Sequence, residues 1–201
     1  MKLSFGRLAA AAATLALAVS LGACSADPLA QQYLEGSNKG FIAADGFQTE
    51  EILPGERGEP IVFTGEADSG ETVSSDDYAG GVTVVNFWYA GCGPCRAEAP
   101  QLEEAHAAFD GEDVAFLGIN LFDEAEVSLA FAETYGVTYP SALAARDGDL
   151  KLAFADATSI SAVPTTLVLD QQGRVAARII GIVSSASILE AMIKTVLKEE
   201  S

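Results

Sequence analysis

The chain has 201 residues, of which 49% are hydrophobic and 20% are charged, a balance that suits one globular domain with a substantial core and argues against wholesale disorder. Its formal net charge of −18 would repel a phosphate backbone, so we do not expect nucleic acid as a partner. The same charge opposes electrostatic adhesion to anionic lipid, and any membrane attachment must therefore be hydrophobic.

Residues 1–23 have the pattern of a secretory signal peptide. Lys2 and Arg7 form a short basic start, and about 16 uncharged, largely apolar residues follow, fewer than the roughly 20 that a membrane-spanning helix needs. The run ends in Leu21-Gly22-Ala23-Cys24, which resembles the lipobox of bacterial lipoproteins. We therefore expect cleavage before Cys24 and lipidation of that cysteine, which would attach the protein to the outer face of the cytoplasmic membrane. An uncleaved membrane helix is the alternative.

Residues 24–58 mix glycine, proline, serine and acidic residues without a sustained period. This composition predicts a lipid-anchored tether that becomes partly ordered where it meets a domain spanning residues 59–201. The domain is expected to begin with a short hairpin, formed by residues 61–64 and the stretch around Thr72 and Val73.

The remaining elements alternate between strand and helix. Val82–Trp88 is apolar on both faces, as expected of a central strand that is covered on both sides. After it the patterns predict a helix at 94–109, a strand at 114–120, a helix at 124–135, a hairpin of strands 166–170 and 175–180, and a helix at 185–198. This order predicts an α/β fold of three layers, with a central mixed sheet flanked by helices and an N-terminal β-hairpin.

Cys92 and Cys95 follow the central strand and are separated only by Gly93 and Pro94. A structural zinc site needs four ligands, and the chain adds only one histidine, His106, to this pair. A structural disulfide that closes a loop of two residues would stabilise the domain little. We therefore expect neither a metal nor a structural role for the pair.

A redox-active pair fits the predicted geometry. Cys92 falls where a strand ends and a helix begins, so unpaired backbone N–H groups and the positive end of the helix dipole favour its thiolate. Cys95 lies one helical turn further on, where it can attack a mixed disulfide formed at Cys92. Gly93 lets a substrate approach closely, and Pro94 presets the first helical turn. This interpretation requires the Cys92 sulfur to be ionised and reachable near neutral pH.

The stretches NFWYAGCGPCRAEAP, SAVPTT and DQQG resemble the thioredoxin superfamily and, more narrowly, the membrane-tethered TlpA/ResA-like thiol–disulfide oxidoreductases of bacterial cell envelopes. The resemblance covers residues 59–198. It implies a thioredoxin-like fold and an extracytoplasmic enzyme that needs no cofactor and reduces disulfides of envelope proteins, apocytochrome c among them. It also implies a membrane-embedded thiol protein as electron donor.

The same resemblance assigns roles around the cysteines. Pro164, preceded by a cis peptide bond, should face them, and Val163 before it should pair with an extended substrate strand. Trp88 should form a wall of the site.

Glu98, one turn beyond Cys95, should exchange a proton with that cysteine. The alternative for Glu98 is a first-turn carboxylate favoured by the helix dipole. Asn86 stands where thioredoxins carry a buried aspartate, which moves the expected proton handling to Glu98.

Two other functions stay open at this point. The pattern of the domain also resembles peroxiredoxins, which makes a thiol peroxidase the second enzymatic hypothesis. A non-catalytic binding lipoprotein with a permanent disulfide is the third. Between the reducing and the oxidising direction, the Gly-Pro pair between the cysteines favours reduction, and Val163 does not decide.

Overall fold

The computed structural model describes residues 41–42, 48–159 and 161–199, all within one unit that spans residues 38–201. The expected signal peptide and the lipidation site Cys24 lie outside the described residues and stay predictions. In the part of the chain that is described, no helix is both long and apolar enough to cross a membrane.

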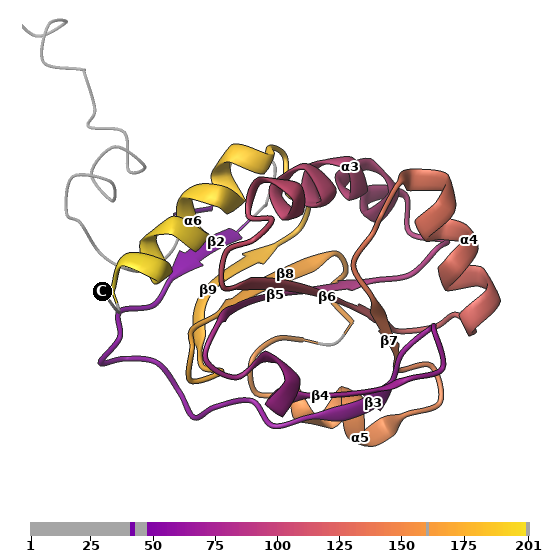
Figure 1. Cartoon of the computed structure of the whole chain (residues 1–201), viewed down its shortest axis with the longest axis horizontal. Coiled ribbons are helices and arrows are strands. Elements are labelled where there is room, and N and C mark those ends of the chain that lie inside the picture. The colour runs from indigo at the N-terminus through magenta and orange to yellow at the C-terminus, as the bar shows by residue number, and fades with distance from the viewer. Residues whose placement is uncertain (1–40, 43–47, 160, 200–201) are drawn as a thin grey trace, which may run out of the picture. The chain divides into compact units, whose positions relative to one another are not determined.

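A mixed sheet forms the centre of the fold (Figure 1). Within the described residues it has seven strands in the order β1-β2-β9-β8-β5-β6-β7, in which the pairs β5–β6 and β6–β7 are parallel and the others are antiparallel. The strands are β1 (Phe41–Ile42), β2 (Gln48–Glu51), β5 (Val82–Trp88), β6 (Val114–Asn120), β7 (Ser141–Leu143), β8 (Thr165–Leu169) and β9 (Val175–Ile180).

Helices and a separate hairpin cover the two faces of this sheet. In Figure 1, α3 and α6 lie over one face, whereas α5 and the hairpin lie over the other. These elements are α3 (Gly93–Ala108), α4 (Ala125–Tyr135), α5 (Gly148–Ala153), α6 (Ala186–Lys198), the hairpin strands β3 (Thr64–Glu66) and β4 (Thr72–Ser74), and the short helix η1 (Ser75–Tyr78).

Strand β5 is buried along its whole length because it contributes to the core on both faces. Val82 and Val84 belong to the cluster formed with residues of α3 and α6, whereas Val85 and Phe87 belong to the cluster formed with α5 and Phe63. A strand with this double burial needs a continuous apolar run, which is what the sequence shows. The predicted three-layer α/β fold with a mixed central sheet is confirmed.

The structure departs from the predicted elements at several points. Strand β2 lies inside the segment expected as a tether, and it pairs antiparallel with β9, with Gln48 opposite Ile180. The first hairpin strand begins at Thr64 instead of Ile61, because the Ile61 N–H donates to the Gly173 carbonyl outside the hairpin. Strand β7 and helix α5 were not predicted, since three and six residues are too few to show a period.

A buried ion cluster fastens residues 52–57 to the domain. The side chain of Arg57 is 2% exposed and donates to Asp170, to Glu199 and to the Ile52 carbonyl. Arg174 donates to the same Asp170 carboxylate. Burial acts to raise the pKa of Asp170, but the hydrogen bonds from Arg174 and Arg57 outweigh it and hold that pKa below its usual value. The last part of the expected tether is therefore part of the folded domain.

Candidate active site

The junction between β5 and α3 positions the two cysteines. Cys92 is the N-cap residue of α3, and its sulfur accepts a hydrogen bond from the Cys95 N–H at 3.1 Å. Pro94 occupies the first turn, where a missing N–H costs nothing. The sulfur of Cys92 thus takes the place that a serine or aspartate oxygen usually occupies at a helix start, in the positive field of the helix end.

Cys92 and Cys95 are joined by a disulfide, with their Cα atoms 5.2 Å apart. Cys92 is 4% exposed and Cys95 is 2% exposed, whereas Gly93 and Pro94 between them are exposed. A Cβ added to Gly93 would have no neighbour nearer than 4.0 Å, so the space over this residue is open. Both cysteines are therefore largely covered, the exposed surface next to them is that of Gly93 and Pro94, and Cys95 is the less exposed of the two cysteines.

Trp88 and Val163 belong to the apolar surroundings of the disulfide. Both pack in the cluster that contains Cys92 and Cys95, and Trp88 is only 5% exposed. The Val163–Pro164 peptide bond is cis, as the resemblance implies, and the Pro164 carbonyl accepts from the Gly181 N–H. Val163, which is half-buried, thus packs against the cluster that contains the two cysteines.

Glu98 is fully buried one turn beyond Cys95. Its Oε1 accepts from the Asn86 side-chain amide at 2.9 Å, and its Oε2 accepts from the Val183 N–H at 2.8 Å. Burial raises the pKa of Glu98 to about 7, an effect that these two hydrogen bonds only partly offset. The group can therefore gain or lose a proton near neutral pH, although its hydrogen-bond partners among the described residues do not include a cysteine.

Asn86 has a larger role than the sequence indicated. Besides Glu98, its amide nitrogen donates to the Thr166 hydroxyl at 3.1 Å, so it joins α3 to two adjacent strands of the sheet. The sequence identified Asn86 only as a residue that cannot carry a proton. An amide side chain within a buried, largely apolar strand was the signal that it holds something in place.

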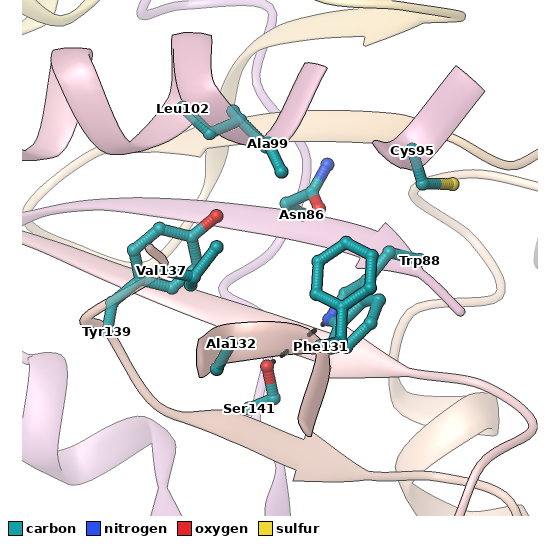
Figure 2. Close-up of a pocket in the computed structure, with 10 residues that line it drawn as sticks. All are labelled: Asn86, Trp88, Cys95, Ala99, Leu102, Phe131, Ala132, Val137, Tyr139 and Ser141. Atoms are coloured by element: carbon teal, nitrogen blue, oxygen red, sulfur yellow. Dashed lines mark hydrogen bonds between the residues drawn. The ribbon is translucent and has the colours of Figure 1, made fainter. Parts of the chain in front are cut away.

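A small cavity lies behind Cys95 (Figure 2). Its volume is about 10 Å³, room for about one water molecule. The lining residues are Asn86, Trp88, Cys95, Ala99, Leu102, Phe131, Ala132, Val137, Tyr139 and Ser141. Burial, reinforced by the negative charges of Glu98 and Glu103, raises the pKa of Tyr139 far above neutrality, so its hydroxyl keeps its proton. On the side of this cavity, Cys95 therefore has space for about one water molecule and mainly apolar neighbours.

The loop before Cys92 is held by Asp123, which the sequence did not identify. Asp123 Oδ2 accepts from the Ala90 N–H at 2.6 Å and from the Asn120 amide at 3.1 Å. Asn120 Oδ1 in turn accepts from the Asp123 N–H. The loop after β6 therefore fixes the backbone two residues ahead of the nucleophilic position.

His106 lies away from the cysteines. Its ring packs against Phe116 and Tyr139 and lies 3.2 Å from the Thr138 hydroxyl. It is half-buried. Among the described residues, no group of three or more Cys, His, Asp or Glu side chains could hold a metal ion.

Comparison with known proteins places this geometry in a family. The model of the AhpC/TSA family matches residues 59–178. The chain belongs to the AhpC/TSA family. It is similar to the thiol-disulfide oxidoreductase ResA of Geobacillus thermodenitrificans, 30% identical over 112 residues, 56% of this chain and 62% of that protein. It is also similar to ResA of Bacillus subtilis, 27% identical over 130 residues, 65% and 70% of the two chains. The match thus spans less than two thirds of the first relative.

Solved structures show the same fold. A DsbF homologue from Corynebacterium diphtheriae has a TM-score of 0.65 at 31% identity and covers 78% of this chain and 98% of its own. A secreted thiol-disulfide isomerase from Corynebacterium glutamicum has a TM-score of 0.66 at 27% identity, with coverage of 78% and 96%. StoA from Bacillus subtilis has a TM-score of 0.54 at 26% identity, with coverage of 66% and 96%. The resemblance to thioredoxin-fold oxidoreductases is confirmed.

Proposed function

We propose that this protein is an extracytoplasmic thiol–disulfide oxidoreductase that reduces disulfides through Cys92 and Cys95. The observation that carries the proposal is the position of Cys92 at the start of α3, where its sulfur accepts a backbone N–H and is bonded to a second cysteine one turn away. The relatives named as thiol-disulfide oxidoreductases and the secreted isomerase support the same chemistry.

The reaction proceeds by two exchanges. The thiolate of reduced Cys92 attacks one sulfur of a client disulfide, a mixed disulfide forms, and the other client sulfur leaves as a thiolate. Cys95 then attacks the Cys92 sulfur, which releases the second client thiol and leaves the Cys92–Cys95 disulfide. Two electrons pass to the client, and an external dithiol must restore the reduced pair.

Glu98 is the proposed proton acceptor for Cys95. The thiol of Cys95 must ionise before it attacks, and a carboxyl group with a pKa of about 7, one turn away, suits that task. Because no direct hydrogen bond joins the two groups in the oxidised form, the proton transfer requires either a shift of the Cys95 side chain or a water between the two groups.

The cellular setting is part of the proposal. The signal-peptide pattern and the lipobox resemblance at Cys24 support secretion and membrane attachment, and the Corynebacterium glutamicum protein is named as secreted. Disulfide-containing envelope proteins, with apocytochrome c among them, are the proposed clients, and a membrane-embedded thiol protein is the proposed donor. Only the sequence resemblance supports these partners.

The test uses the full chain purified in detergent. After reduction, the wild-type protein should reduce insulin, the Cys92→Ser variant should not, and the Cys95→Ser variant should accumulate a mixed disulfide. If Cys92→Ser reduces insulin at the wild-type rate, the proposal is wrong. Rapid consumption of hydrogen peroxide would instead identify a thiol peroxidase. A reduction potential below about −300 mV, without exchange activity, would identify a permanent structural disulfide.

A further inference from the structure

Trp88 has two specific contacts beside the disulfide, and they come from two different elements. Its ring packs against Phe131 of α4, with the ring centroids 4.2 Å apart and the ring planes inclined by 37°. Its indole N–H donates to the Ser141 hydroxyl of β7 at 3.2 Å, the dashed line in Figure 2. The separation between α4 and β7 therefore decides where the indole lies.

Asp68 connects to both of these elements. It lies in the turn of the β3–β4 hairpin and is only 9% exposed. Its Oδ2 accepts from the Ser128 hydroxyl of α4 at 2.7 Å, one helical turn before Phe131. Its backbone N–H donates to the Ser141 carbonyl at 2.8 Å, and its Oδ1 lies 3.4 Å from the Ser141 N–H. One side chain thus spans the helix and the strand that hold Trp88.

Gly118 supplies independent evidence that this arrangement is specific. It lies in the middle of β6, where glycine is unfavourable because it packs no side chain. A Cβ at this position would lie 2.2 Å from the Ser141 hydroxyl oxygen and 2.7 Å from the Trp88 indole nitrogen. Glycine is therefore the residue that leaves room for the indole–serine hydrogen bond.

A hairpin that only covered the sheet would not need this aspartate. Burying a carboxyl group costs free energy unless its oxygens are hydrogen-bonded, and an apolar turn residue would cover the sheet without that cost. The Asp68 oxygens are instead directed at the two elements that contact Trp88. Since Trp88 and Cys95 both line the small cavity, the location of the indole determines how the protein packs against Cys95.

We propose that Asp68 is a positioning residue of the redox site. It holds α4 and β7 at a fixed separation, so that the Trp88 indole stays packed against Phe131 and hydrogen-bonded to Ser141 beside Cys92 and Cys95. This inference deepens the proposed function. The expected effect of Asp68 on the rate of disulfide reduction rests on that function. Its structural consequence, the fixed indole, can be measured whether or not the protein exchanges disulfides.

The test uses the fact that Trp88 is the only tryptophan in the chain, so that its indole N–H gives a single NMR resonance in the full chain. In Asp68→Ala this resonance should move, and its hydrogen exchange should speed up about tenfold, as expected for a weakened buried hydrogen bond. The second-order rate of insulin reduction should fall about threefold to tenfold for the same reason. An unchanged, protected indole in folded Asp68→Ala would overturn the inference.

Asp68→Asn serves as the conservative variant. Its amide oxygen can accept from the Ser141 N–H, and its amide nitrogen can donate to the Ser128 hydroxyl, so both connections survive. This variant should restore most of the indole protection and most of the reduction rate. If Asp68→Asn behaves like Asp68→Ala, the two connections are not what fixes the indole, and the inference is wrong.

Asp77→Ala is the control for loss of an aspartate with the same kinds of hydrogen bond at an exposed position. Asp77 also accepts from a backbone N–H and a serine hydroxyl, those of Ser74, at 2.7 and 3.0 Å. Its loss should leave the indole resonance and the rate unchanged, and an effect equal to that of Asp68→Ala would reduce the inference to general destabilisation.

If Asp68→Ala does not fold, Ser128→Ala takes its place, because it removes only the connection to α4 and should shift the resonance in the same direction. A wild-type chain that exchanges no disulfides would refute the proposed function, and the indole measurements would still decide this inference.

Discussion

Replacing Glu98 with glutamine should abolish a large pH dependence of the unfolding free energy. In the folded protein Glu98 keeps its proton up to about pH 7, whereas the ordinary value of its pKa is 4.5. Between these values, unfolding releases a proton. The contribution of Glu98 to the unfolding free energy of the wild-type protein is therefore complete below pH 4.5, and it is lost as the pH rises through about 7.

The size of the effect follows from the two pKa values. At 1.36 kcal/mol for each unit of pKa, the change from 4.5 to about 7 corresponds to about 3 kcal/mol. That is a large part of the unfolding free energy of a typical domain, which is roughly 5–15 kcal/mol. The Glu98→Gln variant has no titrating group at this position, and its amide oxygen can still accept from the Val183 N–H while Asn86 turns to accept from its amide nitrogen.

The assay is urea unfolding of both proteins, with the disulfide intact, at several pH values across this window. The difference in unfolding free energy between wild type and Glu98→Gln should change by about 3 kcal/mol in favour of the variant from the acid to the neutral end. Other titrating groups cancel in this difference. Glu103→Gln, a half-buried carboxyl on the same helix, is the control and should keep the wild-type slope because it keeps Glu98. Equal slopes for wild type and Glu98→Gln would refute a carboxyl that stays protonated up to pH 7.

Three further predictions concern Asn86, Asp170 and Gly118. Asn86→Asp places a second carboxyl where an amide donates to Glu98 at 2.9 Å, so the two carboxyl groups should share one proton. The loss of unfolding free energy with rising pH should then occur at a higher pH than in the wild type, which the same urea series would show. Asp170→Asn should cost about 2 kcal/mol at pH 7, because Asp170, with its lowered pKa, stabilises the fold above its ordinary value of 3.8. That deficit should shrink as the pH falls below 3.8, and a deficit independent of pH would contradict the prediction. Gly118→Ala should lower the unfolding free energy by about 1–3 kcal/mol through overpacking and shift the emission of Trp88, whereas wild-type emission would exclude the clash.

The sequence predicted those features of the site that depend on neighbours in the chain. The position of Cys92 at a strand–helix junction follows from an apolar run, a CxxC pair and a proline within about ten residues. Asp68 could not be found in this way, because its partners Ser128 and Ser141 are 60 and 73 residues away. Strand β2 was taken for tether because it is a short, half-exposed, polar strand whose pairing with β9 leaves no periodic pattern.

The location of the buried carboxyl has a consequence for the reduced form. Glu98 and Cys95 lie one turn apart on the same buried side of α3, and in a medium of low dielectric constant two anions so close together are disfavoured. Ionisation of Cys95 and of Glu98 must therefore be coupled, so that in the dithiol form a negative charge on either group opposes ionisation of the other. The proton stays on Glu98 while Cys95 is a thiolate. It can leave Glu98 once formation of the Cys92–Cys95 disulfide has removed the thiolate charge. Because Glu98 also holds the Val183 N–H ahead of α6, each redox cycle changes the charge at the contact between α3 and the chain that leads into α6.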